Sequence, residues 1–340
     1  MTLAPARPLP RARRAPAPAH PVLEAVEVEH RFRNGRGVGP VSLKIAAGER
    51  VALMGPNGAG KTTLLDLLAT AARPRRGEVR WYGSTSPRKA RRLIGTAPDT
   101  AVEEGGLTAR QATFFWCCQW VPRASAGGLV DDALRRFGLT AVADDRVASF
   151  SFGMRRRLAL AQALVHGPRL ALLDEPTAGL DPEGVRALDV ALLARTQRGQ
   201  ATVVASNDCD FVAMSCTRVL FLDGGRVIHD AAPDALLAQV GAIRVAEIEV
   251  RGRGSLDAVR SLDGVGEVHA AGGRVSVELL DERALATVVS TVDADAGLVS
   301  LRVHIPDLDD VFTALTGRGL GAGGDPRPVH SRASRGRWRR

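Results

Sequence analysis

The sequence lacks any apolar run approaching the roughly 20 residues that a helix needs to span a bilayer, so we expect no membrane-spanning helix. Its N-terminal segment is rich in Pro, Ala and Arg and lacks the apolar stretch of a secretory signal, which argues against export. Cysteine is sparse, and no pair among the four residues has the C-x-x-C spacing of a zinc or redox motif. Reduced thiols in a cytoplasmic protein are the simpler interpretation of Cys117, Cys118, Cys209 and Cys216.

Surplus charge is also missing from the middle of the chain. Residues 1–20 hold four Arg and no acid, and residues 321–340 hold six Arg and one Asp, which together account for the whole net charge of +9. Residues 21–320 are therefore neutral overall, which argues against a nucleic-acid-binding domain, because such a domain carries its charge on the folded part. We expect disordered basic tails at residues 1–21 and 319–340, with contact to anionic lipid as an alternative role.

What the chain does contain is a series of short apolar segments. Three of them are continuously apolar, at residues 50–54, 170–173 and 202–205. Such segments predict strands of a parallel sheet that is covered on both faces. In a sheet of this kind, ligands bind beyond the carboxyl ends of the strands. Residues 22–32 and 41–46 alternate between apolar and polar side chains, as half-buried strands do. Residues 108–165 are expected to be mostly helical, with breaks at Gly127-Gly128 and at Gly153.

After about residue 240 the pattern changes. Segments typical of strands and helices alternate in the order βαββαβ, which predicts a small ferredoxin-like α+β domain: strands at 245–250, 265–269, 274–280 and 298–304, and helices at 255–262 and 282–292. No phosphate-binding or metal-binding pattern occurs in this part of the sequence, so we expect the chemistry to lie upstream.

The strongest motif is a complete G-x-x-x-x-G-K-T between a predicted strand and a predicted helix: Gly55, Pro56, Asn57, Gly58, Ala59, Gly60, Lys61 and Thr62, followed by Thr63. Backbone N–H groups of such a loop surround phosphate oxygens at the positive end of the helix dipole. Lys61 is expected to reach the β- and γ-phosphates and Thr62 to bind Mg²⁺. The chain has only three Lys, Lys44, Lys61 and Lys89, which indicates that a compact ammonium is required at this position.

A second motif is the pair of acids that follows the strand at residues 170–173. An acid at the end of a buried strand opposite a P-loop holds Mg²⁺, which we expect of Asp174. The adjacent Glu175 is placed to act as a general base on the attacking water. Together the two motifs predict a P-loop nucleotide hydrolase that uses ATP and Mg²⁺.

The segment Phe150-Ser151-Phe152-Gly153-Met154 and the ten residues after it resemble the signature motif and helix of ABC ATPases. Residues 176–181 are similar to the D-loop of that family, and Phe32 stands where the family has an aromatic residue that stacks on adenine. The resemblance covers roughly residues 22–235. It implies an α/β P-loop NTPase fold at 22–238, with a parallel-sheet core, an antiparallel β subdomain and a helical signature subdomain, followed by the small domain at 244–318.

Met154 in place of Gln is similar to the ABC-2 export branch, and residues 305–318 resemble the C-terminal ending of daunorubicin-resistance ATPases. The resemblance therefore implies an ATPase subunit that powers export of an antibiotic or drug-like molecule. Its partners would be a separate ABC-2 transmembrane subunit and a second copy of the chain, at the cytoplasmic face of the cell membrane. In such a homodimer, Ser151 and Gly153 of one copy close on the γ-phosphate held by the other.

Two positions depart from the family pattern. Asp99 stands where the family has a Gln that senses Mg²⁺ and water, and we expect its carboxylate to serve as a further Mg²⁺ ligand. Asn207 stands where the family has a switch His, and we expect it to act in catalysis through a hydrogen bond to the γ-phosphate. An Asn side chain donates hydrogen bonds but carries no charge. An alternative function is therefore a weakly hydrolysing ATP-binding module that gates or regulates a membrane partner. A soluble ABC ATPase acting on DNA or ribosomes is a further alternative, disfavoured by the neutral middle of the chain.

Four of the chain's aromatic residues fall within seven positions: Phe114, Phe115, Trp116 and Trp120. The core of the helical subdomain is one interpretation, because aromatic side chains dominate cores. A groove for a cytoplasmic helix of a transmembrane partner is the other, because aromatic side chains also anchor interfaces.

Overall fold

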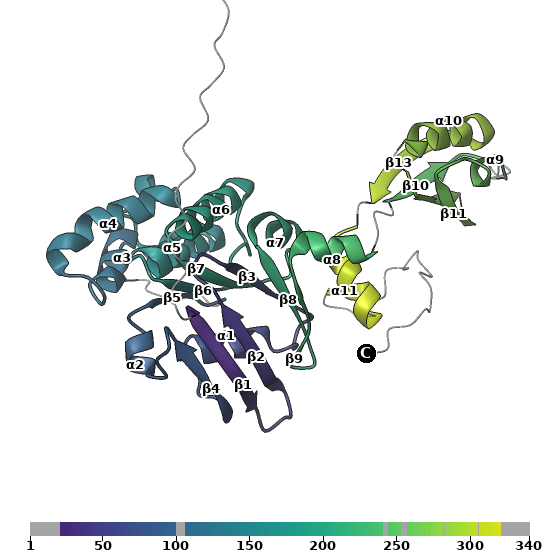
Figure 1. The fold of residues 1–340 in the computed structure, drawn as a ribbon. Helices are drawn as coiled ribbons and strands as arrows, with labels where there is room; N and C mark the ends of the chain where they lie inside the picture. Colours follow the sequence, from purple (N-terminus) through teal and green to yellow (C-terminus); the bar gives the residue numbers. More distant parts are fainter. Residues whose placement is uncertain are drawn as a thin grey trace, which may run out of the picture. The chain divides into compact units, whose positions relative to one another are not determined.

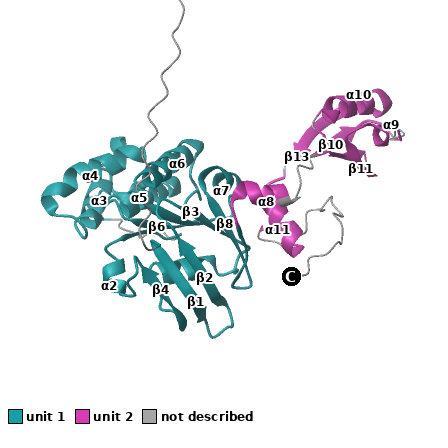
Figure 2. Cartoon of the chain, viewed as in Figure 1, with its two compact units in different colours: residues 1–230 teal, residues 231–340 magenta. Residues whose placement is uncertain are grey.

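The computed structural model describes residues 21–99, 106–240, 244–252, 257–271, 273–281, 283–304 and 306–320. Contacts divide the chain into two compact units, residues 1–230 and 231–340 (Figure 2). The basic tails that the sequence predicts lie outside the described residues, apart from residues 21, 319 and 320. Among the described helices, none is both long enough and apolar enough to cross a bilayer.

The first unit is built on a six-stranded sheet in the order β5-β6-β7-β3-β8-β9 (Figure 1). The strands from β5 to β8 pair in parallel. Their bounds are β3 Arg50–Met54, β5 Ile94–Ala97, β6 Leu170–Asp174, β7 Ala201–Ala205, β8 Arg218–Asp223 and β9 Arg226–Ala231. Strands β6 and β7 are buried along their whole length, as their continuous apolar sequences predict. Helices follow β3, β6 and β7: α1 Lys61–Leu68, α6 Pro182–Gln197 and α7 Cys209–Ser215.

A three-stranded antiparallel sheet, β2-β1-β4, packs against the same core. Its strands are β1 Leu23–Arg31, β2 Gly37–Ile45 and β4 Arg76–Trp81, and the short helix α2 Pro87–Ala90 follows β4. The indole Nε1 of Trp81 donates to the carbonyl of Leu68 at 2.9 Å, which joins β4 to the end of α1. The antiparallel sheet therefore lies next to the helix that begins at the P-loop.

The helical region holds α3 Ala109–Cys117, α4 Arg123–Arg136, the 3-10 turns η1 Thr140–Val142 and η2 Val147–Ser149, and α5 Phe152–Leu164. The predicted break at Gly127-Gly128 is wrong, because α4 runs through both glycines. Ala126, Val130 and Leu134 are buried at helical spacing, whereas both glycines are exposed. The apolar stripe therefore holds α4 together despite about 1 kcal/mol lost at each glycine. The break predicted at Gly153 is also misplaced, since α5 already begins at Phe152.

The aromatic cluster does not form the core that one interpretation assigns to it. Phe114 packs against the core of the helical region, whose buried members come from other positions, such as Ala112, Leu134 and Phe137. Phe115 is 54% exposed, and Trp120 is 37% exposed and stacks on His166 with ring centroids 5.0 Å apart. Phe115 and Trp120 are therefore the members of the cluster with exposed surface available to a partner.

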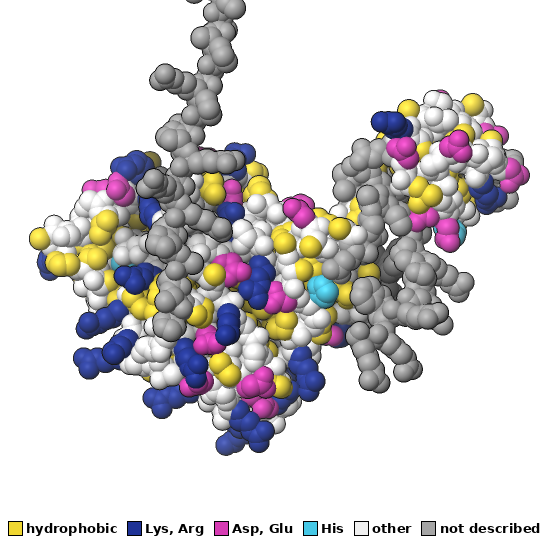
Figure 3. Space-filling model, viewed as in Figure 1, with side chains coloured by type: hydrophobic (Ala, Val, Ile, Leu, Met, Phe, Trp, Pro, Cys, Tyr) yellow, Lys and Arg dark blue, Asp and Glu magenta, His cyan; other side chains and the backbone are white. Residues whose placement is uncertain are grey.

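Basic side chains are distributed unevenly over the first unit. On the face shown in Figure 3, Lys and Arg side chains gather around the part of the unit that holds β4 and α2. The exposed basic residues of that stretch are Arg73, Arg75, Arg76, Arg88, Lys89, Arg91 and Arg92. Although the net charge of residues 21–320 is zero, this part of the surface is therefore locally positive.

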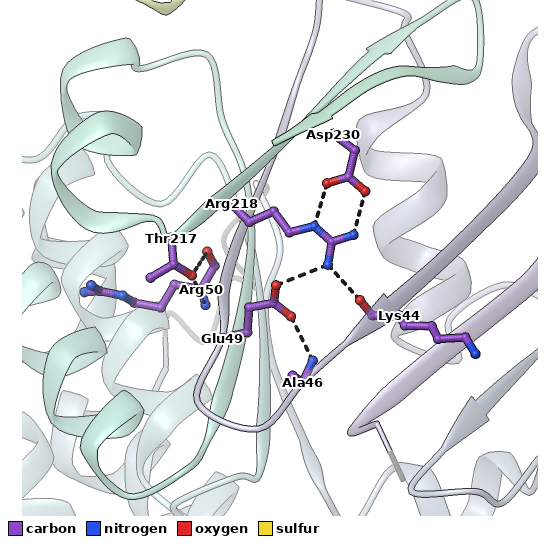
Figure 4. Close-up of polar contacts among 7 residues, drawn as sticks. All are labelled: Lys44, Ala46, Glu49, Arg50, Thr217, Arg218 and Asp230. Carbon is purple, nitrogen blue, oxygen red and sulfur yellow. Dashed lines mark hydrogen bonds and ion pairs between the residues drawn. The ribbon is translucent and has the colours of Figure 1, made fainter. Parts of the chain in front are cut away.

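The guanidinium of Arg218 joins three segments of the first unit (Figure 4). It forms a two-pronged ion pair with Asp230 on β9, with N–O distances of 2.6 and 2.5 Å. Its third nitrogen donates to Glu49 at 3.1 Å and to the carbonyl of Lys44 at 2.9 Å, at the turn between β2 and β3. These partners raise the pKa of Arg218, against the opposing effect of burial. One cation therefore ties the antiparallel sheet to the edge of the six-stranded sheet.

We expect Arg218→Ala to lower the free energy of unfolding by about 2 kcal/mol, because it removes charged hydrogen bonds worth about 1.5–3 kcal/mol at a partly exposed position. Urea unfolding followed by circular dichroism measures this change. Arg226→Ala on the exposed side of neighbouring strand β9 is the matched control. A loss no larger than that of Arg226→Ala would contradict the structural role.

The second unit contains a four-stranded antiparallel sheet in the order β11-β12-β10-β13. Its elements are α8 Pro233–Val240, β10 Arg244–Val250, α9 Asp257–Arg260, β11 Val265–Ala271, β12 Arg274–Leu279, α10 Ala284–Ala296, β13 Leu298–His304 and α11 Leu308–Thr316. From β10 to β13 the order is βαββαβ, as the sequence predicts, and α9 and α10 share one core with the sheet. Helix α8 packs against α11 within this unit. The predicted domain limits, 22–238 and 244–318, stay a prediction.

Candidate nucleotide-binding site

The loop after β3 adopts a conformation that only glycine enters without strain. Gly55 and Gly60 have φ values of 156° and 104°, and Gly60 is the N-cap of α1. A Cβ at Gly55 would lie 2.1 Å from the carbonyl oxygen of Leu222, which excludes any larger residue. The loop therefore turns its backbone toward the N-terminus of α1, where unpaired N–H groups and the helix dipole favour an anion.

Lys61, the first residue of α1, is 7% exposed, and its ammonium donates to the carbonyl of Gly55. Burial lowers the pKa of Lys61, whereas Glu175 and Asp174 raise it. A buried ammonium beside two acids and a glycine loop is the arrangement that a polyphosphate and its cation require.

The two acids follow β6 at the same edge of the sheet. Burial raises the pKa of Asp174, and a hydrogen bond from Thr62 opposes that rise. The carboxylate of Glu175 accepts a hydrogen bond from Ser206 Oγ at 3.2 Å. Burial also raises the pKa of Glu175, partly offset by Lys61. A carboxylate with a raised pKa accepts a proton more readily, as a general base must.

A pocket of about 410 Å³ lies over the loop. Most of the predicted site residues line it: Phe32, Pro56, Asn57, Gly58, Ala59, Gly60, Lys61, Thr62, Thr63, Asp99, Asp174 and Glu175. Phe32 is 49% exposed and meets His30 edge to face, with 4.9 Å between ring centroids. Three further lining residues, Asn34, Arg36 and Gly37, were not predicted. Asn34 and Arg36 lie in the turn from β1 to β2, and Gly37 begins β2. The Asn-Gly pair at residues 34–35 is the local sequence signal for this turn.

Oxygen ligands suitable for Mg²⁺ meet at one side of this pocket. Thr62 and Asp174 both line it, and the Thr62 hydroxyl lowers the pKa of Asp174. Hydroxyl and carboxylate oxygens are the groups that Mg²⁺ prefers. Asp99 lines the same pocket, but its carboxylate is paired with the guanidinium of Arg156 at 3.7 Å. The residues present therefore fit Mg²⁺ best through Thr62 and Asp174.

Asn207 lies beside the glycine loop rather than in the pocket lining. Its Oδ1 accepts a hydrogen bond from the backbone N–H of Gly55 at 3.2 Å. The residue before it, Ser206, holds Glu175, so both residues after β7 contact the site. Asn207 is among the site residues predicted from the sequence, whereas Ser206 is not.

Ser151 and Gly153 are not among the residues that line the pocket. Ser151 is the N-cap of α5, and its hydroxyl accepts from the N–H of Met154 at 3.2 Å. Gly153 lies in the first turn of α5, and a Cβ there would be 2.7 Å from the carbonyl of Gly179. Phe152 is 56% exposed, and its ring lies next to Gly179 in the segment after Glu175. The N-terminus of α5, which carries the signature segment, therefore lies outside the lining of the pocket of its own chain.

A glycine loop on a helix N-terminus, a buried lysine and two acids on a neighbouring strand together define a P-loop nucleotide-binding ATPase domain. The sequence model of the family described as ABC transporter matches residues 38–178. The chain is 31% identical over 306 residues to the daunorubicin resistance ATP-binding protein DrrA2 of Streptomyces coeruleorubidus, which covers 87% of this chain and 95% of that protein. The chain belongs to the ATP-binding proteins of the ABC transporter family.

Other relatives extend the comparison. The linearmycin resistance ATP-binding protein LnrL of Bacillus subtilis (strain 168) is 28% identical over 88% of this chain and 99% of its own length. The Nod factor export ATP-binding protein I of Bradyrhizobium diazoefficiens is 33% identical over 87% and 96%. Among solved structures, an ATP-binding subunit of an ABC transporter superposes with a TM-score of 0.61 at 26% identity, over 65% of this chain and 93% of that one. The chain is thus similar to these proteins over nearly their full length.

Proposed function

We propose that this chain binds ATP with Mg²⁺ and hydrolyses it to power export of an antibiotic or drug-like molecule through a separate ABC-2 membrane subunit. The observation that carries the proposal is the pocket in which Lys61, Asp174 and Glu175 meet the glycine loop. The names of the relatives, which include daunorubicin and linearmycin resistance proteins, support the cargo class.

Each residue of the site has a proposed role. The N–H groups of the loop and Lys61 hold the phosphates, and Thr62 and Asp174 hold Mg²⁺, which shields phosphate charge when bound. Phe32 stacks on the adenine ring, and its half-exposed position at the pocket edge supports this role. Glu175 orients the attacking water and accepts its proton.

We propose that two copies assemble head to tail, so that Ser151 and Gly153 of one copy complete the site of the other. The support is the exposed N-terminus of α5, which carries both residues and lies outside the pocket of its own chain. Backbone N–H groups there would face the γ-phosphate. Because this contact uses backbone, the exposed Phe152 does not obstruct it.

The proposed location is the cytoplasmic face of the cell membrane, with the chain bound peripherally. The exposed aromatic side chains of Phe115 and Trp120 support a contact with a membrane partner. The basic surface around β4 and α2 supports proximity to anionic lipid.

The proposal is tested by ATP titration and phosphate release, measured on the purified chain with and without its co-purifying membrane protein. We expect ATP binding without the partner and faster phosphate release with it. Absence of ATP binding would overturn the proposed function, and binding without release in the complete assembly would favour the gating module instead.

The gating alternative rests on Asn207, whose side chain is engaged with Gly55 and carries no charge. We expect Asn207→His to raise the turnover number about tenfold, because imidazole stabilises the charge that builds on the γ-phosphate better than a neutral amide does. Steady-state phosphate release of the complete assembly measures the change. A brisk parent rate that falls in this variant would show that Asn207 is well fitted to its place.

A further inference from the structure

Arg156 on α5 is the most deeply buried cation next to the nucleotide pocket, with 2% of its surface exposed. Its Nη1 donates to the carbonyl oxygens of Pro98 at 2.7 Å and Asp99 at 3.3 Å. Its Nη2 donates to the carbonyls of Asp174 and Glu175. One guanidinium thus holds the backbone after β5 and the backbone after β6 at the same time.

The backbone of Glu175 needs such support. Its φ is 43°, in the left-handed region that a non-glycine residue adopts only at a cost of about 1–3 kcal/mol. The N–H of Glu175 donates to the carbonyl of Ala205 at 2.7 Å, and Arg156 binds its carbonyl from the other side. The strained peptide is therefore held at both ends, which directs the carboxylate toward Ser206 and the pocket.

Arg156 also faces the charge that Asp99 brings to the site. Nη2 lies 3.7 Å from Asp99 Oδ1, and the Asp99 side chain is 60% exposed on the pocket side. An uncompensated carboxylate there would repel a polyphosphate. Because Arg156 is held by four carbonyl oxygens, its charge stays fixed beside Asp99.

We propose that Arg156 is a positioning residue for ATP binding and hydrolysis, which neutralises Asp99 through its charge and fixes the strained backbone of Glu175 through its forked hydrogen bonds. The inference rests on the proposed function and assigns the two roles to two separable properties of one side chain. Lys shares the charge of Arg but not the fork.

The charge role is tested by ATP affinity, measured by titration of the full-length chain in EDTA and again in Mg²⁺. We expect Arg156→Gln to weaken ATP binding about fivefold, since Asp99 then repels the phosphates unopposed. Adding Asp99→Asn to that variant is expected to restore the affinity to within about twofold of the parent. If Arg156 only stabilised the fold, Asp99→Asn would not restore ATP affinity. A double variant that binds ATP as weakly as Arg156→Gln alone would therefore overturn this role.

The role of the forked hydrogen bonds is tested with Arg156→Lys, which keeps the positive charge. We expect this variant to keep the parent's ATP affinity while its turnover number falls about tenfold. Arg195→Gln is the matched control, because Arg195 is 3% exposed and donates to the carbonyls of Pro168 and Ala201 at the amino ends of β6 and β7. It should lower the melting temperature and leave affinity and turnover unchanged. Parent turnover in Arg156→Lys would overturn the role of the fork, whereas a parent that binds no ATP would overturn the proposed function instead.

Discussion

Glu175→Gln should reduce the turnover number by roughly 10²–10⁴-fold, the usual contribution of a general base. The substitution preserves the shape of the side chain and removes its ability to accept a proton. In the parent, Glu175 is half-buried beside Asp174, and this partial burial is the main reason that its pKa is raised. Because the amide introduces no new charge near the phosphates, ATP affinity should stay the same or rise. Phosphate release under saturating MgATP, with the membrane partner present, measures the loss.

The same variant should accumulate as an ATP-bound dimer, since closure would no longer be followed by hydrolysis. Size-exclusion chromatography with MgATP detects this species. Glu267→Gln, an exposed change of the same kind on β11, is the control for the substitution itself. Turnover that survives in Glu175→Gln would assign the base to another group, and Asp174 would then be the first to examine.

Local sequence was sufficient for the parts of the fold that depend on short-range pattern. The continuously apolar strands β3, β6 and β7 and the glycine loop lie where the sequence predicts them. The sequence-based predictions are wrong where tertiary packing, rather than local sequence, determines the structure. Gly127 and Gly128 do not break α4, because a stripe that includes Ala126, Val130 and Leu134 is buried along the other side of the helix. None of the four aromatic residues belongs to the buried core of the helical region, because large side chains from other segments, such as Phe137, Phe150 and Leu158, already occupy it.

The site residues likewise divide into those that local sequence predicts and those that only the fold brings together. The loop and the two acids were predicted because each motif is contiguous in the sequence. Arg156 was not, because it is the middle of three consecutive arginines that look alike in sequence. Only the fold distinguishes them: Arg155 donates to the carbonyl of Phe150, Arg157 pairs with Asp181, and Arg156 turns inward to the acids. The pocket residues Asn34 and Arg36 were missed for the same reason, since the antiparallel sheet places their turn beside the loop.

Lys61→Ala should weaken ATP binding by about one to two orders of magnitude, because it removes a charge-assisted contact worth about 1.5–3 kcal/mol. The structure adds a second reason. The ammonium of Lys61 lies near both Asp174 and Glu175 and opposes the rise in their pKa. Without it, two carboxylates face the phosphates with less compensating charge, so the loss should lie toward the upper end of that range.

Titration of the purified chain with ATP, in EDTA and in Mg²⁺, measures the effect of Lys61→Ala. The loss should be larger in EDTA, because Mg²⁺ takes over part of the charge compensation when it binds at Thr62 and Asp174. The chain offers a matched control in Lys89→Ala, since Lys89 is an exposed lysine on α2. Equal affinity of the Lys61 and Lys89 variants would mean that ATP is held elsewhere, and the assignment of the glycine loop as the phosphate site would fail with it.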